Sequence, residues 1–411
     1  MCCQHLTKTV NVSVVFLVIT VLLTGCWDRL EIEQRTTVLG IAIDQATEEE
    51  AAQESSTTHV QGSFQAPDHK FIKLTLTVAV PGRLALGPGG PESGGGEGQE
   101  GKPVWVLESI GHSIDDALNN LEQQLEHELF LGHVRIIVVS EEFAKQGVKE
   151  FSDYLRRNSE IRRTTWMAVG KGKASQYLHF TPEIERIPTL YLVKTFDEAV
   201  QSGKLPEAYL GLFWTHLSSK GQDGYLPYVK LIENKIVEIS GLAYFDKDLM
   251  IGKTVPLEIG YFMSIMNVGK AGYKALIPLD GSTVIAEATS RNSRIYSEIR
   301  HGKPHFTIKE VIELNITEKN GPLWTMNSSR ELRKLQQETQ LLAKKGHEKL
   351  IKTMQQDGAD IFGFGEIVRA KHARYWNEHI KTKEKWKEIF PDVTFENDVT
   401  FYIRRVGMKA R

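Results

Sequence analysis

The sequence predicts an α+β protein of several domains, which we interpret as three. Its 411 residues exceed what one hydrophobic core usually organises, because single cores stop growing at about 250–300 residues. Segments with the two-residue alternation of a strand lie both before and after a long segment with helical spacing. The 50 lysines and arginines nearly balance the 52 aspartates and glutamates, which leaves no overall basic field for nucleic acid.

Residues 1–25 have the form of a cleaved signal peptide. The first nine residues include His5 and Lys8 but no acid. Residues 10–23 are a run of Val, Leu, Ile and Phe that three polar residues interrupt. This run is shorter than the ~20 apolar residues of a membrane-spanning helix, which favours a signal peptide over a retained membrane anchor.

The cysteines of the chain are Cys2, Cys3 and Cys26. Because all of them precede the folded body, they offer it no disulfide framework and no cysteine-based zinc site, and Cys26 has no nearby thiol for redox catalysis. The segment "LTGC", which ends at Cys26, resembles the bacterial lipoprotein box. The resemblance implies a diacylglycerol on the sulfur of Cys26, an N-acyl group, and signal cleavage between Gly25 and Cys26.

A polar tether at residues 26–35 leads into an expected N-terminal α/β domain over residues 36–200. The segments "TTVLGIAIDQ" and "FIKLTLTVAV" predict strands. Residues 81–103 are so rich in Gly and Pro that we expect a flexible loop. Within it, "GEGQEGK" fits the first seven positions of a phosphate-binding loop. Pro103 stands where that motif needs Ser or Thr and a strand follows, so we attribute the match to chance.

The clearest alternation of helix and strand follows residue 112. Ser113 with Asp116 resembles a capping box. The apolar residues after it would share one helix face: Ile114, Leu118, Leu121, Leu125 and Leu129. A strand at "HVRIIVVS", a helix over about residues 148–157 and a strand at "TTWMAVG" complete the expected α/β layer.

The second half of the chain predicts a different unit. Residues 201–235 read as a connector or a small middle region, and residues 236–411 as a C-terminal α+β domain. The segment "KIVEISGLAYFDKDLMIGK" predicts two strands joined by a turn. Ser328 and Glu331 form a capping box for a long helix, and "DVTFENDVTFYIRRVG" predicts a last strand that returns to the sheet.

No pattern in the body predicts catalysis. His127 and His133 lie six residues apart across an expected helix-to-strand turn, and a single metal would not reach both. His372 and His379 lack the acid of an HExxH pattern, so we expect solvated side chains. Ser113 in "GHSID" stands at a helix start, where capping is its simpler role. We therefore expect no catalytic, metal-binding or cofactor-binding residue.

Four stretches, in this order, resemble the Ger(x)C subunits of bacterial spore germinant receptors. They are "GCWDRLEIEQRTTVLGIAID", "LFLGHVRIIVVSEEFAKQGVKEFSDYLRRNSEIRRTTWMAVGKGKASQYL", "GLAYFDKDLMIGK" and "DIFGFGEIVRAKHARYWNEHIKTKEKWKEIFPDVTFENDVTFYIRRVG". The likeness covers nearly the whole chain, and Cys26 matches the lipidated cysteine of the family. It implies a three-domain α+β fold without catalytic activity.

The resemblance also implies partners and a location. The chain would be a lipid-anchored subunit on the outer face of the inner spore membrane of an endospore-forming bacterium. It would assemble with membrane lipid and two integral-membrane subunits, of the A and B types, and with no nucleic acid or cofactor. We expect an exposed aromatic patch near Trp376 and Trp386 to be a place where partners bind. The alternative is a stand-alone exported substrate-binding lipoprotein or surface enzyme.

Overall fold

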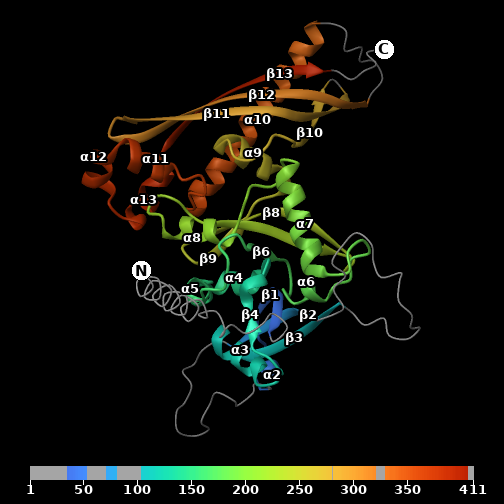
Figure 1. Ribbon diagram of the computed structural model, residues 1–411. Helices are drawn as coiled ribbons and strands as arrows, with labels where there is room; N and C mark the ends of the chain where they lie inside the picture. The colour runs from blue at the N-terminus through green and yellow to red at the C-terminus, as the bar shows by residue number, and fades with distance from the viewer. Residues whose placement is uncertain (1–34, 53–70, 81–102, 280, 321–328, 406–411) are drawn as a thin grey trace, which may run out of the picture.

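Two β-sheets with helices between and beside them form the molecule (Figure 1). The computed structural model describes residues 35–52, 71–80, 103–279, 281–320 and 329–405. The predicted signal peptide, Cys26, the "GEGQEGK" segment and the Ser328 end of the capping box lie outside these residues. In Figure 1 the second sheet lies at the top and the first sheet in the lower half.

Within the described residues, the first sheet has nine strands. They are β1 (Thr36–Gln45), β2 (Ile72–Ala79), β3 (Val104–Gly111), β4 (Leu129–Phe130), β5 (Ile136–Ser140), β6 (Trp166–Gly170), β7 (Tyr225–Ile232), β8 (Ile236–Asp246) and β9 (Leu249–Lys253). The order is β3-β2-β1-β5-β6-β7-β8-β9, with β4 beside β1. The central strands β1, β5, β6 and β7 are parallel, and the outer strands on both sides are antiparallel.

Helices cover both faces of the first sheet, which explains its apolar central strands. Every residue of β5 and β6 is buried, as expected for parallel strands packed on both sides. The helices of this half are α2 (Glu48–Ala51), α3 (Ile114–Glu122), α4 (Glu141–Gln146), α5 (Lys149–Arg157), α6 (Gln176–His179), α7 (Pro188–Gln201) and α8 (Leu210–Ser218). Buried side chains of α3, α4, α5 and α8 pack with Ile137 and Val139 of β5, whereas those of α6 and α7 pack with Ile136 and Val138.

The second sheet has the order β10-β11-β12-β13. Its strands are β10 (Lys274–Leu279), β11 (Ser282–Arg300), β12 (Lys303–Asn320) and β13 (Thr394–Arg405). The long β11–β12 hairpin turns at His301 and Gly302, which both have positive φ, as a type I′ turn requires. Strand β13 adds to the sheet parallel to β12 and confirms the predicted return of the last strand.

Helices of the second half pack between the sheets and along the second one. They are α9 (Pro256–Met266), α10 (Ser329–Asp357), α11 (Phe364–Lys371), α12 (Ala373–Tyr375) and α13 (Lys383–Ile389), with a π-helical turn η4 (Trp376–Ile380) and a 3-10 turn (Phe390–Asp392). One hydrophobic cluster joins side chains of α6, α7, α9, α10 and α11 with residues of both sheets, such as Val229 and Phe306.

Two predicted features differ in detail from the structure. Helix α3 begins after Ser113, whose side chain caps it, but ends at Glu122, so Leu125 and Leu129 do not extend its apolar face. The chain turns there because the carboxylate of Glu122 accepts the N–H of Leu129, where β4 begins. The first sheet continues through β8 and β9 to Lys253, beyond the start expected for the C-terminal domain.

Candidate functional site

The described chain begins nine residues after the expected lipid attachment point. Arg35, nine residues after Cys26, lies directly before β1. Its guanidinium lies 4.8 Å from the ring centroid of Phe130 and 3.9 Å from the carboxylate of Glu160. These contacts fix Arg35 at the end of the first sheet where β1 begins.

The histidines of the sequence analysis have separate surroundings. His127 is exposed, whereas His133 is half-buried against Phe130. We expected a solvated side chain for His372. Instead, its Nε2 lies 3.0 Å from the hydroxyl of Ser297 on β11. The ring of His379 lies 4.8 Å from that of Tyr375, at a tilt of 47°. Among the residues that the structure describes, no three His, Cys, Asp or Glu side chains gather as a metal site would require.

The expectation of an exposed aromatic patch at Trp376 and Trp386 is wrong. The two residues are only 3% and 2% exposed, and their rings lie 6.1 Å apart. The short helices α11 to α13 fold back so that their aromatic side faces the core and their charged side faces solvent. The Trp386 indole also donates a hydrogen bond to Oδ2 of Asp360 at 3.0 Å, which holds it inside.

Asp360 is the centre of a buried joint between the two halves of the molecule. Its carboxylate accepts the N–H groups of Phe364 (3.1 Å) and Gly365 (2.8 Å). Its own N–H donates to Oδ2 of Asp223 (2.9 Å), and its carbonyl accepts the N–H of Asp223 (2.8 Å). Asp223 precedes β7 and Asp360 precedes α11, so these bonds connect the first sheet to the C-terminal helices.

The charges of this joint are shielded from water. Lys383 on α13 lies 2.8 Å from the carboxylate of Asp223, and both side chains are largely buried. Burial raises the pKa of Asp360 to about 7, and the nearby carboxylate of Asp223 contributes to this rise. The three N–H groups that donate to the Asp360 carboxylate act in the opposite direction. Burial also raises the pKa of Asp223, although Lys383 opposes this effect.

Two glycines allow the backbones of the joint to touch. A Cβ on Gly221 would lie 2.3 Å from the carbonyl carbon of Gly365, and a Cβ on Gly365 would lie 2.6 Å from Cα of Gly221. Glu366 completes the contact, since its carboxylate accepts the N–H of Gly221 at 2.8 Å. The "DIFGFGE" segment is therefore the docking element for residues 221–224.

A second buried polar cluster lies under an apolar cavity of about 220 Å³ between α9, α10 and the second sheet. Ser264 donates to Oε2 of Glu310 at 2.5 Å, and Nδ1 of His347 lies 3.0 Å from Oε1 of Glu310. In a hydrolytic triad the histidine lies between serine and carboxylate, where it can accept the serine proton. Here the carboxylate lies between the other two, so the cluster holds α9 and α10 onto β12.

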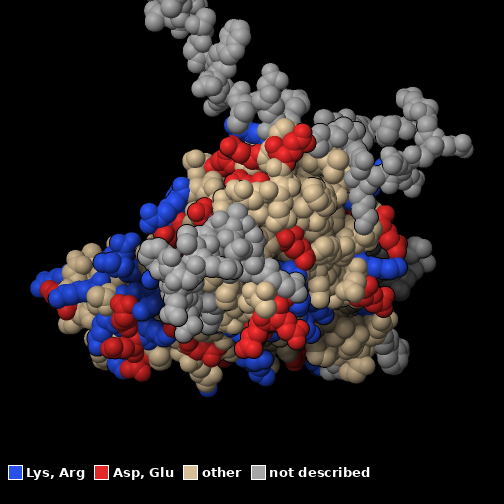
Figure 2. Space-filling model, turned by 90° about the horizontal axis from the view of Figure 1, so that it is seen from below, with Lys and Arg blue, Asp and Glu red and all other residues tan. Residues whose placement is uncertain are grey.

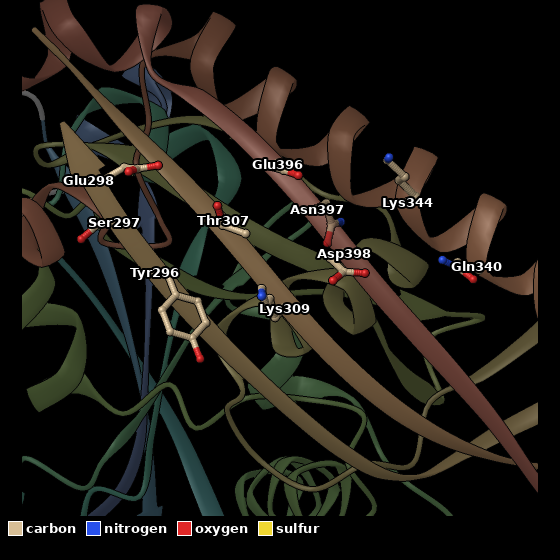
Figure 3. Close-up of a pocket in the computed structure, with 10 residues that line it drawn as sticks. All are labelled: Tyr296, Ser297, Glu298, Thr307, Lys309, Gln340, Lys344, Glu396, Asn397 and Asp398. Atoms are coloured by element: carbon tan, nitrogen blue, oxygen red, sulfur yellow. The ribbon is translucent and has the colours of Figure 1, made fainter. Parts of the chain in front are cut away.

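The outer face of the second sheet carries a broad open groove of about 680 Å³. Figure 3 shows its lining side chains on β11, β12, β13 and α10. Lys309 and Lys344 face a groove that also contains Glu298, Glu396 and Asp398, and all of these side chains are exposed. The mixed charge and open shape do not bring a nucleophile and a base together.

Sequence reasoning missed both buried clusters. Asp223 and Asp360 are 137 positions apart, and Glu310 and His347 come from a strand and a helix. The one available signal was an acid directly before the apolar "IFGFG" segment, since an isolated acid beside apolar residues is rarely left without partners.

Comparison with known proteins decides the family. The family model "Spore germination protein N-terminal domain" matches residues 28–231. The model "Spore germination B3/ GerAC like, C-terminal" matches residues 240–407. The chain belongs to the Ger(x)C family of spore germination proteins. The two matches meet between residues 231 and 240, close to the end of β7.

Relatives of the Ger(x)C family match the chain over almost its full length. Spore germination protein KC of Bacillus subtilis (strain 168) is 23% identical, over 97% of this chain and 96% of its own. Spore germination protein B3 of the same organism is 22% identical, over 97% of this chain and 99% of its own. Spore germination protein GerQC of Bacillus cereus is 22% identical, over 77% and 85%.

A solved structure confirms the fold class. The crystal structure of the GerBC protein superposes with a TM-score of 0.55 and 18% identity, over 83% of this chain and 95% of that chain. The mixed sheets and helices of Figure 1 and this likeness together confirm the predicted α+β class. The Ger(x)C membership gives the chain a role in spore germination.

Proposed function

We propose that this protein is the lipid-anchored, non-catalytic subunit of a nutrient germinant receptor. Its sulfur at Cys26 carries diacylglycerol, its new N-terminus carries an acyl group, and the signal peptide is cleaved between Gly25 and Cys26. The protein lies on the outer face of the inner spore membrane. It assembles there with two integral-membrane subunits, of the A and B types.

One observation carries this proposal. A lipoprotein box at residues 23–26 stands directly before a body that matches spore germination proteins over nearly its whole length. Among the described residues, no helix is both long and apolar enough to cross a membrane. Two acyl chains would supply the stable attachment, because one chain alone gives only marginal binding.

The arrangement of the described polar groups favours a structural role for them. The buried Asp360 carboxylate accepts three N–H groups, and the Ser264 hydroxyl is bonded to Glu310 and not to an imidazole. Groups held in this way stabilise helix and sheet contacts, and they present no poised nucleophile at a surface. This supports the non-catalytic part of the proposal.

Replacement of the lipidated cysteine tests the proposal. We expect Cys26→Ala to abolish diacylglycerol attachment and to lower nutrient-triggered germination at least about tenfold, because an unanchored subunit is diluted away from its partners. Mass spectrometry of the N-terminal peptide and loss of optical density during germination measure the two effects. Cys3→Ala, in the discarded signal peptide, is the matched control and should germinate like the wild type.

Co-purification tests the assembly. Mild detergent extraction of spore membranes should recover the two membrane subunits with the wild-type chain, and recover little of them with Cys26→Ala. If the purified chain alone converted or tightly bound a germinant and co-purified with no membrane subunit, the stand-alone lipoprotein or surface enzyme would be the better description.

A further inference from the structure

A basic groove of about 700 Å³ opens between α5, α8 and α11. Figure 1 shows these three helices one above another on the left side of the molecule. Its cationic residues are Arg156, Arg163, Lys220 and Arg369, and its one carboxylate is Glu366. Lys and Arg side chains also gather, with some acids among them, along the left side of the face shown in Figure 2.

The positive charge of this groove is largely unneutralised. Arg369 is paired with Glu366, whose Oε2 lies 2.6 Å from Nη2 of the guanidinium. Among the described residues, no carboxylate lies within ion-pair distance of Arg163 or Lys220, and both side chains are exposed. Because the whole chain carries a formal charge of −2, this cationic excess is a local feature.

The walls of the groove are firmly held. The Arg156 guanidinium lies 5.4 Å from the Trp214 ring and donates to the Trp214 carbonyl at 3.3 Å. The carbonyl of Arg163 accepts the N–H of Gly211 at 2.9 Å, which fixes α8 beside the residues before β6. A guanidinium so placed can offer two parallel N–H donors to a phosphate group.

The groove lies at the end of the first sheet where β1 begins, and the proposed lipid tether precedes β1 there. Gly40 of β1 is level with Ile136 of β5, and Ile136 is level with Trp166 of β6. Arg163 precedes β6 and therefore lies at the end of the sheet where β1 begins. The ten residues from Cys26 to Arg35 can span at most about 35 Å, so an anchored chain keeps this end of the sheet near the membrane.

We propose that this groove faces the membrane and binds the phosphate groups of anionic lipid headgroups. The inference rests on the proposed lipid attachment at Cys26, which brings the groove to the membrane surface. Basic side chains within a Debye length of such a surface attract it, and the lipid tether converts this weak attraction into a fixed orientation. Figure 1 shows α5, α8 and α11 on the left and the second sheet at the top, so the outer face of that sheet does not face the lipid.

A single fluorescent label tests this orientation. Cys2 and Cys3 leave with the signal peptide and Cys26 is acylated, so Ser159→Cys, in the groove, gives the mature lipoprotein one reactive thiol. Ser290→Cys, exposed on β11, is the matched control. The labelled lipoproteins are reconstituted in vesicles of phosphatidylcholine, with or without phosphatidylglycerol, that contain spin-labelled lipid. We expect the label at Ser159→Cys to be quenched at least about threefold more in the anionic vesicles, and that at Ser290→Cys to be quenched little in either.

Charge reversal identifies the residues responsible. Arg163→Glu with Lys220→Glu should remove the effect of phosphatidylglycerol on the Ser159→Cys label. Lys309→Glu with Lys344→Glu, in the outer groove of Figure 3, makes the same charge change and should preserve it. Equal quenching in both vesicles for the wild type, or an effect that survives reversal in the basic groove, overturns this inference alone. Failure of the wild-type lipoprotein to float with any vesicle overturns the lipid anchor and, with it, this inference.

Discussion

At the scale of single residues, the joint around Asp360 makes stability depend on pH. Burial raises the pKa of Asp360 from 3.8 to about 7, so the folded chain keeps a proton that the unfolded chain releases. Between these two pH values the unfolded state binds fewer protons than the folded state. The free energy of unfolding contributed by this group therefore falls as the pH rises through this window, and it is level above about pH 7.

Asp360→Asn tests this dependence. In the wild type, this group should lower the free energy of unfolding by up to about 4 kcal/mol between about pH 4 and about pH 7, at ~1.36 kcal/mol per pH unit. In the variant, this fall should be absent. Urea unfolding followed by tryptophan fluorescence measures it. Asp398→Asn, on the exposed face of β13, is the control and should keep the wild-type slope. An unchanged slope in Asp360→Asn would show that another group carries the proton.

Some single residues were predictable and others were not. The local sequence around Ser113 predicts its cap, because a cap involves neighbours only three positions apart. The burial of Trp376 and Trp386 could not be predicted, because lysines and aromatics alternate in that segment and only the tertiary fold decides which side faces inward. The partners of Asp360 come from two distant segments, and spacing in the sequence does not reveal them.

At the scale of elements, α9 and α10 are held to the second sheet by a buried contact between a carboxyl group and an imidazole. Glu310 of β12 and His347 of α10 are each 1% exposed, and Ser264 of α9 bonds the same carboxylate. Removing one partner of such a pair leaves the other buried without it, whereas removing both leaves the hydroxyl of Ser264 without its acceptor.

A double-mutant cycle tests this role. We expect His347→Leu to lower the free energy of unfolding by about 1–3 kcal/mol, because the buried carboxyl group of Glu310 loses a polar neighbour. His347→Leu combined with Glu310→Leu should recover most of that loss. Chemical unfolding of the wild type, both single variants and the double variant gives the coupling. Strictly additive effects would mean that the two side chains do not stabilise one another.

The elements themselves were largely predictable, with errors at their ends. Strand β1 follows from the apolar run "TTVLGIAIDQ", and the helix expected near residues 148–157 is α5. Helix α3 ends earlier than its apolar spacing suggests, because the N–H of Leu129 donates a hydrogen bond to the carboxylate of Glu122 and favours a turn there. Periodicity alone does not report such a competing interaction.

At the scale of the whole molecule, the joint at Gly221 and Gly365 should make the two sheets unfold together. Calorimetry of the wild type should show one transition, because the halves share a buried core and buried ionic groups. Gly365→Ala places a methyl group against the opposing backbone and should separate the transition into two or lower its midpoint by several degrees. The neighbouring Lys220→Ala, an exposed site, is the control. Two transitions already present in the wild type would contradict a rigid joint.

Strand order along the chain also constrains how the protein can mature if it is exported as proposed. The bond between Asp223 and Asp360 closes a loop of 137 positions, and β12 gains its parallel neighbour β13 only when the last residues arrive. A chain that crosses the membrane from its N-terminus therefore exposes an unpaired strand edge and an unfinished core until export is nearly complete. With the lipid proposed at Cys26, the start of such a chain would be tethered before its end has emerged, so surface attachment and folding would compete in time. A late premature stop would then leave an anchored but aggregation-prone product.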